Sequence, residues 1–532
     1  MAQLAATLGG EFDEEPLRQL AGRDVDAALS RLEDADLIER VSEFRLGRYR
    51  FRHDLMRDTA YETQVLPRRQ KTHRSVAELL AASATAPGDL AVVAQHWDLA
   101  GDVAQSVPAY MAAAQAAQST ASHTEARQLL DRAQELTSTV PEGDDRDLAE
   151  LMIRAQRTIS TSSLYGYGYP DVFEDYTIAE KICRKLSNRP EIMPVQVGIW
   201  SYLLVRGSVD SASTVLEPLT HVVDDPAAAW FAPEIKSCMG YGAFYQGNLE
   251  EAHRWLVEAW KGYGARSAEA ASSPFWPLPH DAVPVTAVAL ACVSGLQGST
   301  EESALWERRA LATAEELEFP SGPFSAAFVS VYLAWIRMIT GNREEAREFG
   351  RRTIEIAERC RFDYFRLLGT QYVLMPEPDQ PCEVAELEQY ALGMDLVGHG
   401  AFRPTHLGIV AQNHHYLGNA GPALQALDAA MERSASSGEL VHQPDLLRLR
   451  AEIVTAAYPD RMDEAARDLV AAVDIGMAQG SLVLALRAAN DLARLPHDRP
   501  LDWGDRVRRV LDRFPSNSSS PEFAQALDLI EV

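Results

Sequence analysis

The stretch GNLEEAH at residues 247–253 recurs along the chain and decides the fold. It consists of a glycine, a polar residue and a short acidic run that leads to an alanine. Six related copies begin elsewhere: GDVAQSV at 101, GSVDSAS at 207, GSTEESA at 298, GNREEAR at 341, GNAGPAL at 418 and, with proline in the glycine position, PDRMDEAA at 459. From 101 to 459 the successive intervals are 106, 40, 51, 43, 77 and 41 residues. Most correspond to one or two units of about 40 residues, which indicates a repeat array.

The chemistry of each position in this motif predicts a helical hairpin. Glycine adopts the left-handed conformation that ends one helix, and the Asn, Ser or Asp after it caps the next helix. The small alanine lets the two helices approach closely. Because each hairpin leaves an apolar face bare, neighbouring hairpins must stack into a solenoid with a concave groove. The fold class is therefore predicted to be all-α, a tetratricopeptide-like helical-hairpin superhelix, over residues 76–500.

The first 75 residues differ in kind from the array. Helical spacing predicts helices at 2–8, 16–20 and 25–37, with Asp24 as the N-cap of the third. Two alternating runs, 37–41 and 49–51, flank a glycine-containing turn and predict a hairpin. Three helices followed by a hairpin are typical of a winged-helix domain, which we assign to 1–75. A further helix is expected at about 54–64, and 501–532 is expected to cap the array.

Composition excludes several classes of protein. Of 532 residues, 46% are hydrophobic and 24% charged, which excludes wholesale disorder. The formal net charge of -27 disfavours a nucleic-acid-coating role. The five cysteines form no C-x-x-C pair, so the sequence shows no zinc ribbon or redox motif. It also contains no H-E-x-x-H motif, and no metal site is expected. No run reaches the roughly 18 apolar residues of a membrane span, and the N-terminus lacks the basic start of a signal peptide. We expect a cytoplasmic protein that does not contact a membrane.

Two longer segments carry a family resemblance. YRFRHDLMRDTAYETQVLPRRQKTHRSVAELL at 49–80 and SLYGYGYPDVFEDYTIAEKICRKL at 163–186 resemble parts of bacterial signal-transduction (STAND) ATPases. In the relatives linked to class III adenylate or guanylate cyclases, these parts are the winged-helix and tetratricopeptide-like regions. The resemblance covers essentially the whole chain. By the same resemblance, residues 2–12 look like the middle of a longer chain, the helix that normally follows the ATPase core, and whether Met1 is the natural start stays open.

The resemblance implies a regulatory role and not an enzyme. The sequence contains no G-x-x-x-x-G-K-[ST] phosphate-binding loop and no recognisable cyclase domain, so we expect no catalytic residues and no cofactor. ATP or ADP would enter only through a separate ATPase domain. The expected function is to bind a partner protein or effector in the groove and so control an ATPase or cyclase domain, in cis or in trans. The alternative is a winged-helix transcription regulator. The third helix, with four acids and one arginine at 25–37, disfavours it.

His53 is the sharpest single candidate. In signal-transduction ATPases the winged helix carries a histidine that contacts bound ADP, and the resemblance implies this role for His53. An imidazole can donate to a phosphate oxygen. The alternative is a buried histidine that caps the following helix.

A basic segment surrounds His53. Residues 40–74 hold ten Arg and Lys against four acids, a net charge of +6, which leaves -33 for the rest of the chain. Three kinds of partner are possible for this basic segment: DNA, the phosphates of a nucleotide, or an acidic protein surface. Docking to a protein surface is favoured. The residues assigned to this docking patch are Arg48, Arg50, Arg52, Arg57, Arg68, Arg69 and Lys71.

Two aromatic loops are candidates for the ligand groove. Tyrosine and tryptophan give a large contact area with a polar tip, which suits recognition of a peptide or small effector. Aromatic residues at the helix junctions of a solenoid also serve as packing wedges, and this second interpretation stays open. The candidate residues are Tyr165, Tyr167, Tyr169, Phe275 and Trp276.

Overall fold

The computed structural model describes residues 1–22, 24–41, 47–165, 169–186, 192–221, 223–265, 276–496 and 500–531. The described chain is mainly helical and divides into two compact units, Met1–Ser160 and Thr161–Val532. Helix α9 (Asp144–Tyr165) contains the division. The expected boundary at residue 75 falls inside a continuous helix, α5 (Leu66–Ala81). The assignment of separate domain types to 1–75, 76–500 and 501–532 stays a prediction.

The first unit begins with a small helix and sheet assembly. The three strands form an antiparallel sheet in the order β1-β3-β2. Its buried side chains, among them Leu17, Leu29 and Tyr49, form one apolar cluster. The elements are α1 (Ala2–Leu8), β1 (Glu11–Asp13), α2 (Glu14–Ala21), α3 (Asp26–Asp34), β2 (Ile38–Arg40) and β3 (Arg48–Phe51).

The three expected helices and both expected strands are present, but two details differ. Strand β1 was not predicted, because a run of three residues with only Phe12 buried is too short to establish a pattern. Helix α3 ends at Asp34 and not at 37, because Asp36 takes a left-handed conformation with φ 55°. The Asp24 carboxylate accepts a hydrogen bond from the amide of Asp26 at 2.9 Å. It therefore helps to start this helix, although Val25 is the N-cap residue. Assignment as a winged helix stays a prediction.

Helical hairpins complete the first unit. Their facing surfaces bury alanines and leucines such as Ala114, Leu130 and Ala133 in one cluster. The helices are α4 (Asp54–Glu62), α5, α6 (Pro87–Leu99), α7 (Val103–Ser119), α8 (His123–Ser138) and the first part of α9.

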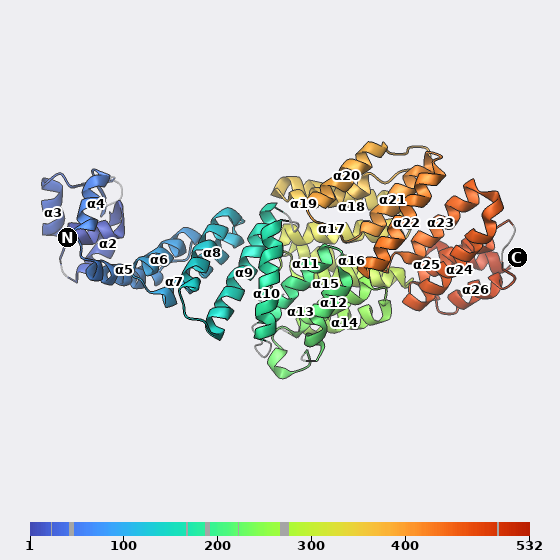
Figure 1. Cartoon of the computed structure of the whole chain (residues 1–532), viewed down its shortest axis with the longest axis horizontal. Helices are drawn as coiled ribbons and strands as arrows, with labels where there is room; N and C mark the ends of the chain where they lie inside the picture. The colour runs from blue at the N-terminus through green and yellow to red at the C-terminus, as the bar shows by residue number, and fades with distance from the viewer. Residues whose placement is uncertain are drawn as a thin grey trace. The chain divides into compact units, whose positions relative to one another are not determined.

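The second unit is an array of helical hairpins, drawn in Figure 1 as successive pairs of helices. Its largest core cluster runs from Met193 to Leu484 and therefore spans most of the array. The helices are α10 (Pro170–Lys185), α11 (Met193–Val205), α12 (Val209–Thr220), η2 (Pro226–Ala228), α13 (Ala232–Tyr245), α14 (Leu249–Gly264), α15 (Ala282–Leu296), α16 (Thr300–Glu315), α17 (Ser321–Ile339), α18 (Arg343–Cys360), α19 (Asp363–Val373), α20 (Val384–Leu396), α21 (Arg403–Tyr416), α22 (Ala420–Ser437), α23 (Gln443–Ala457), η3 (Pro459–Arg461), α24 (Met462–Gln479), α25 (Leu482–Ala493), α26 (Trp503–Leu511) and α27 (Pro521–Glu531).

The repeat turns have the conformation that the sequence motif predicts. All six motif glycines have positive φ, between 70° and 87°. The residue after each glycine donates its amide to the carbonyl five residues earlier, at 2.8–3.2 Å, which is a Schellman ending. Side-chain capping is rarer than predicted, because among the six polar residues only Asp102 and Asn342 accept a cap hydrogen bond. The alanine or serine five residues after each glycine is buried: Ser106, Ala212, Ala252, Ser303, Ala346 and Ala423.

The later part of the array returns to contact the earlier part. The amides of Gly400 and Ala401 donate to the carbonyl oxygen of Val205, at 2.7 and 3.0 Å. Leu440 donates in the same way to Tyr245, at 2.8 Å. Arg487 donates from Nη1 to the carbonyl of Ile339 at 2.7 Å. The array therefore closes on itself through backbone groups.

One helix, α17, is long and apolar enough to cross a membrane by length and composition. Of its 18-residue window, 67% is buried inside the protein. The core helix of a soluble protein passes the same test, and packing within the array accounts for the apolar character of α17.

Candidate functional site

A cavity of about 70 Å³ lies inside the second unit, lined by helices α11, α13, α15, α17 and α19. These are the first helices of successive hairpins, so the cavity lies on the inner side of the array. Two connecting segments, 276–281 and 399–402, complete its wall. Ten of the 22 described lining residues are Phe, Tyr or Trp, and two more are histidines. Those that define its shape are Trp200, Tyr241, Phe324, Phe328, Tyr332 and Phe402.

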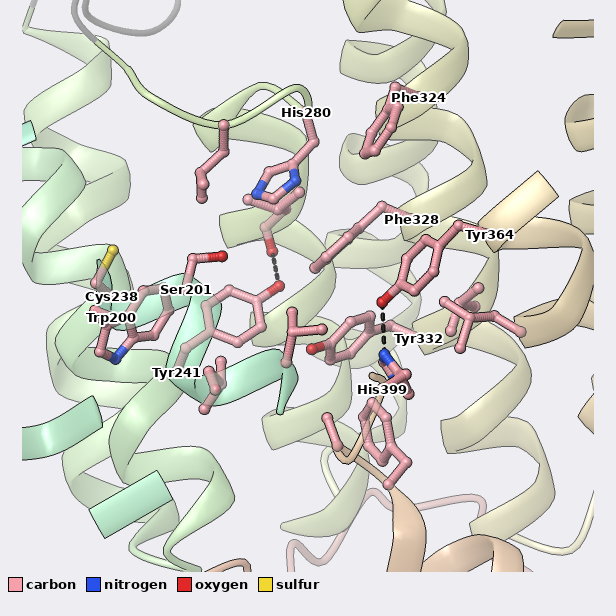
Figure 2. A pocket seen from close by; sticks show the side chains of 18 of the residues that line it. Trp200, Ser201, Cys238, Tyr241, His280, Phe324, Phe328, Tyr332, Tyr364 and His399 are labelled. Carbon is pink, nitrogen blue, oxygen red and sulfur yellow. Dashed lines mark hydrogen bonds between the residues drawn. The ribbon is translucent and has the colours of Figure 1, made fainter. Parts of the chain in front are cut away.

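Helical spacing places three of these rings in a row. Phe324, Phe328 and Tyr332 are four residues apart and therefore share one face of α17. The rings of Phe328 and Tyr332 stack with centroids 4.8 Å apart. Tyr241 meets Tyr332 edge to face, at 5.7 Å. Figure 2 shows these rings gathered around the cavity, with His280 entering from the 276–281 segment.

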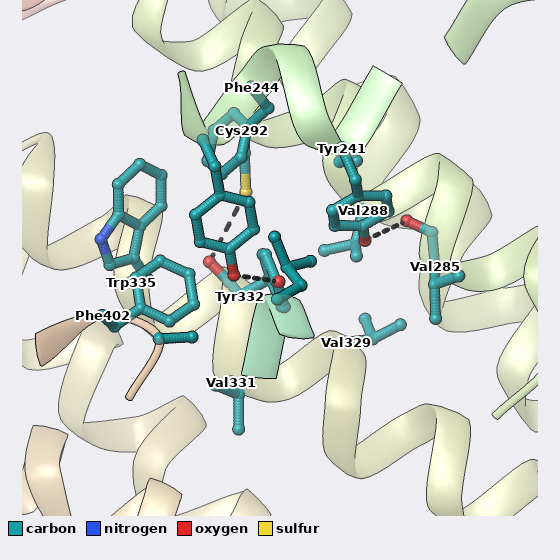
Figure 3. Close-up of a cluster of buried hydrophobic side chains, with 14 of the residues drawn as sticks. Tyr241, Phe244, Val285, Val288, Cys292, Val329, Val331, Tyr332, Trp335 and Phe402 are labelled. Atoms are coloured by element: carbon teal, nitrogen blue, oxygen red, sulfur yellow. Dashed lines mark hydrogen bonds between the residues drawn. The ribbon is translucent and has the colours of Figure 1, made fainter. Parts of the chain in front are cut away.

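A tightly packed hydrophobic core lies behind the aromatic residues that line the cavity. Phe244 and Trp335 meet edge to face at 5.4 Å, and Trp335 also packs against Phe402 at 5.6 Å. The Cys292 thiol donates a weak hydrogen bond to the carbonyl of Tyr332, at 3.7 Å (Figure 3). These contacts hold the backbone of α17, so the rings that face the cavity are attached to a rigid support.

Several polar groups of the wall already have partners. The Tyr241 hydroxyl donates to the carbonyl of Val285 at 2.7 Å. The hydroxyls of Tyr245 and Tyr332 lie 2.6 Å apart. The Tyr364 hydroxyl lies 2.6 Å from Nδ1 of His399 (Figure 2).

Four polar side chains have atoms with no such partner. The Ser201 hydroxyl and the His280 imidazole make no hydrogen bond with any other residue that the structure describes. Nε1 of Trp200 and Nε2 of His399 also have no partner among the described residues. All four residues are more than nine-tenths buried and line the cavity. Buried polar groups normally have partners, so these four are candidates for contact with a bound molecule.

The site is uncharged at neutral pH. None of its described lining residues is Asp, Glu, Lys or Arg. Burial lowers the pKa of His280 and His399 to about 3, so both rings are neutral. Burial also raises the pKa of Tyr241 and Tyr332 well above its usual range. The site has no acid or base poised near neutral pH.

The sequence-predicted aromatic residues separate into two groups. Trp276 lines the cavity and donates from Nε1 to the carbonyl of His280 at 2.5 Å. Tyr165 and Tyr169 stack on each other at 4.6 Å, are exposed, and do not line the cavity. Their role as groove residues stays a prediction. Tyr167 and Phe275 lie outside the described residues.

The aromatic residues of the helices were not predicted from the sequence. The predicted candidates lie in loops, whereas most aromatic residues of the cavity wall lie on the first helices of the hairpins. A signal was present, since Tyr241 and Tyr245, like Phe324, Phe328 and Tyr332, recur every four residues. This spacing places rings on a single helix face.

His53 is the N-cap residue of α4, is exposed, and makes no capping hydrogen bond through its side chain. The alternative of a buried capping histidine is therefore wrong. A role toward a nucleotide phosphate stays a prediction.

The basic patch is largely neutralised over its strand and α4 portions. Arg48 pairs with Glu11 at 3.0 Å, and Arg50, Arg52 and Arg57 also have carboxylate partners. By contrast, no ion pair within the described residues involves Arg68, Arg69 or Lys71 of α5, whereas Arg74 of the same helix pairs with Asp102 at 3.3 Å. Arg69 contacts the ring of Tyr61, at 4.9 Å from its centroid. The unneutralised part of the patch is Arg68, Arg69 and Lys71.

A buried histidine pair joins α5 to α6. Nδ1 of His73 lies 2.8 Å from Nδ1 of His96, and the Tyr61 hydroxyl lies 2.7 Å from Nε2 of His73. Burial, assisted for His73 by the neighbouring His96 and Arg69, lowers the pKa of both histidines to about 4. The chain of contacts joins α4, α5 and α6.

In the part of the chain that the structure describes, no group of three or more His, Cys, Asp or Glu is arranged to hold a metal ion. The described cysteines are all free thiols.

Comparison with known sequences gives one distant relative. No protein-family model matches the chain. An uncharacterized protein of Rhizobium meliloti (strain 1021) is 24% identical over 510 residues, which cover 93% of this chain and 48% of that protein. The chain thus spans about half the length of the curated relative it matches.

The solved structures that align with this chain include helical repeat proteins. A STAND protein with a tetratricopeptide repeat sensor from Pyrococcus horikoshii aligns with 99% of this chain and 64% of its own, at 12% identity and a TM-score of 0.28. A Rap protein complexed with competence and sporulation factor aligns with 81% and 98%, at 12% identity and 0.39. The Cut9–Hcn1 hetero-tetramer of the APC/C aligns with 89% and 94%, at 12% identity and 0.38. These superpositions are too loose to assign a role to any residue here.

Proposed function

We propose that the chain is the non-catalytic sensor region of a signalling protein, and that a small effector occupies the aromatic cavity of the second unit. Occupancy then controls an associated signalling ATPase or nucleotide cyclase. The observation that carries this proposal is the cavity itself. It is lined by first helices of successive hairpins, and its wall is completed by the 399–402 segment, which is hydrogen-bonded back to Val205.

This construction couples binding to the shape of the array. A ligand shifts an equilibrium only as far as its affinities for the two states differ. A tenfold change in output needs about 1.4 kcal/mol of differential binding. The segment 399–402 contributes both the cavity wall and the closing hydrogen bonds to Val205, so a ligand in the cavity acts directly on closure.

The partner surface in this proposal is the unneutralised cluster on α5. Arg68, Arg69 and Lys71 contrast in sign with a chain of net charge -27. They suit an acidic protein surface, with long-range attraction that accelerates association. The partner would be an ATPase or cyclase domain, in cis or in trans. ATP or ADP would bind in that domain and not in this chain.

The test uses the half of the Rhizobium meliloti relative that lies outside the match. This half is purified and mixed with the chain, and ATP hydrolysis and cyclic-nucleotide formation are measured. We expect nucleotide turnover by that half, at least fivefold lower when the chain is added, and no turnover by the chain alone. A charge-reversed chain, Arg68→Glu with Lys71→Glu, is the matched control and is expected to lose the effect. Turnover that the chain leaves unchanged would contradict the proposal.

A further inference from the structure

We infer that the molecule bound in the aromatic cavity is a small, uncharged, single-ring aromatic compound with one hydrogen-bonding substituent, of the phenol or aniline class. This inference rests on the proposed sensor function and names the chemistry of its effector. Four features of the cavity lead to it: the orientation of the rings, the absence of charge, the number of available polar groups, and the size.

The walls present ring faces. Phe328 stacks on Tyr332 with an interplanar angle of 23°, and the His280 ring lies over Phe328 at 4.6 Å and 33°. Figure 2 shows His280 directed from its segment toward Phe328 and Tyr241. Aromatic groups pair best in offset stacks or edge to face, with centroids 4.5–7 Å apart. A wall of rings in stacked, tilted and edge-to-face arrangements therefore favours a flat aromatic guest.

The surroundings exclude a strongly charged guest. The described lining offers no arginine or lysine to pair with a carboxylate or phosphate. Glu439, fully buried, lies beyond Phe402, accepts a hydrogen bond from its amide at 3.0 Å and lies 2.5 Å from Nε2 of His442. It therefore adds no cationic partner for an anion. A cation would find aromatic faces but no carboxylate among the lining residues, and an unpaired buried charge is costly.

The polar groups available to a guest are few, which favours a single polar substituent. The Ser201 hydroxyl, the His280 imidazole, Trp200 Nε1 and His399 Nε2 have no partner among the described residues. In the pair Tyr245–Tyr332, one hydroxyl donates to the other, so a single proton of the pair is left without an acceptor in the described structure. A phenolic hydroxyl or an amino group uses these few positions. A sugar or peptide carries many more polar groups, and most would be buried unpaired.

The volume of the cavity sets an upper limit on the size of the guest. A water molecule needs about 10–15 Å³ of such space, and an engineered cavity of about 150 Å³ holds benzene. The cavity here has about 70 Å³ and is partly open. One ring is therefore the largest guest, and its entry requires outward movement of wall side chains such as Trp276 or His280. This movement is how occupancy would reach the rest of the array.

The test uses the purified full chain and a matched set of probes: phenol, aniline, toluene, benzoate, cyclohexanol and tetramethylammonium. Thermal unfolding and tryptophan fluorescence are measured against probe concentration. Phenol and aniline are expected to bind saturably with one site and to raise the melting temperature. Benzoate and tetramethylammonium are expected to do neither, and cyclohexanol, which is not flat, to bind at least tenfold more weakly than phenol.

Three variants locate the site. Ser201→Ala and His280→Phe are each expected to weaken phenol binding about five- to tenfold, the loss of one hydrogen bond, and to leave toluene binding unchanged. Ser201→Leu fills the cavity and is expected to abolish binding of both. Ser106→Ala, at a buried serine of the first unit, is the control and should bind phenol like the native chain.

Two results would overturn the inference. Binding of tetramethylammonium but not phenol would mean a cation site. Failure of phenol, aniline and toluene alike, with Ser201→Leu unchanged in stability, would mean a packing gap. The proposed sensor function is tested by a separate result. If phenol binds but does not alter the nucleotide turnover of the partner half, the ligand assignment is supported and the sensor function is contradicted. If the chain controls turnover but does not bind phenol, the sensor function is supported and the ligand assignment is contradicted.

Discussion

The amide of Gly400 donates a 2.7 Å hydrogen bond to the carbonyl oxygen of Val205, which joins a late turn of the array to an early one. A side chain on either partner turn would prevent this approach. A Cβ on Gly400 would lie 2.1 Å from the carbonyl oxygen of Arg206, and one on Gly207 would lie 2.5 Å from that of Gly400. The closure of the array therefore depends on bare backbone on both sides.

Substitution Gly207→Ala tests this closure against a matched control. Gly207 and Gly418 have similar φ, 70° and 76°, but a Cβ at Gly418 would meet nothing within 4 Å. Left-handed backbone costs an alanine about 1–2 kcal/mol at either site. Overpacking against Gly400 should add a further ~1–3 kcal/mol at Gly207 only. Urea denaturation measures both variants, and equal losses of stability would show that the close approach does not hold the array closed.

The buried histidine pair predicts acid sensitivity of the first unit. Burial lowers the folded-state pKa of His73 and His96 from 6.5 to about 4, so the unfolded chain binds more protons between these values. Stability contributed by the neutral pair is complete above pH 6.5 and is lost as the pH falls toward 4. The loss is on the order of 3 kcal/mol for each ring.

Hydrogen exchange of the α5 peptide 66–81 at pH 7, 6 and 5 measures this effect in the full chain. Exchange is expected to accelerate as the pH falls, after correction for the intrinsic rate. His73→Leu should flatten the dependence, whereas the exposed His221→Leu should not. A native chain whose corrected exchange is constant across this range would refute the prediction.

The paired hydroxyls of Tyr245 and Tyr332 predict a non-additive mutant cycle. Removal of one hydroxyl leaves the other buried without this partner, at a cost of about 1–3 kcal/mol. The double change Tyr245→Phe with Tyr332→Phe removes both polar groups and is expected to cost less than the sum of the single changes. Denaturation of the four proteins in urea gives the coupling energy. A coupling near zero would mean that the two hydroxyls act independently.

The charge distribution around α3 predicts no DNA binding at physiological salt. The described helix, Asp26–Asp34, has Asp26, Glu33 and Asp34 against Arg31. These acids would face the phosphates of a groove-bound duplex and repel them. Titration of a labelled duplex at 150 mM salt should give no shift. A shift that disappears only at high salt, and that is lost in Arg68→Gln with Lys71→Gln, would instead support the transcription-regulator alternative.

The repeat turns were predictable because their signal is local. A glycine with positive φ, the helix ending before it and the small buried residue five positions later are all specified within one short motif, as Gly247 and Ala252 illustrate. The two strands near residues 38 and 50 were likewise predictable from alternation. Strand β1 was not, since three residues carry too little pattern.

The cavity was not predictable because its residues meet only through tertiary structure. Trp200, Tyr241, Phe328 and Phe402 come from separate hairpins, and nothing in the separate segments indicates how far the array curves. The sequence predicted an open groove lined by loop aromatics. The chain instead brings helix aromatics together on its inner side, and Trp276 is the only predicted aromatic among the described residues that reaches them.

The hydrogen bonds from Gly400 to Val205 and from Leu440 to Tyr245 also fix the length of the intervening chain. An ordinary open solenoid can gain or lose a hairpin during evolution, since each unit touches only its neighbours. Here, deletion of one hairpin between these contacts would bring the wrong turn opposite each partner and would separate the aromatic rings. The closing hydrogen bonds therefore require a fixed number of hairpins between the turns that they join.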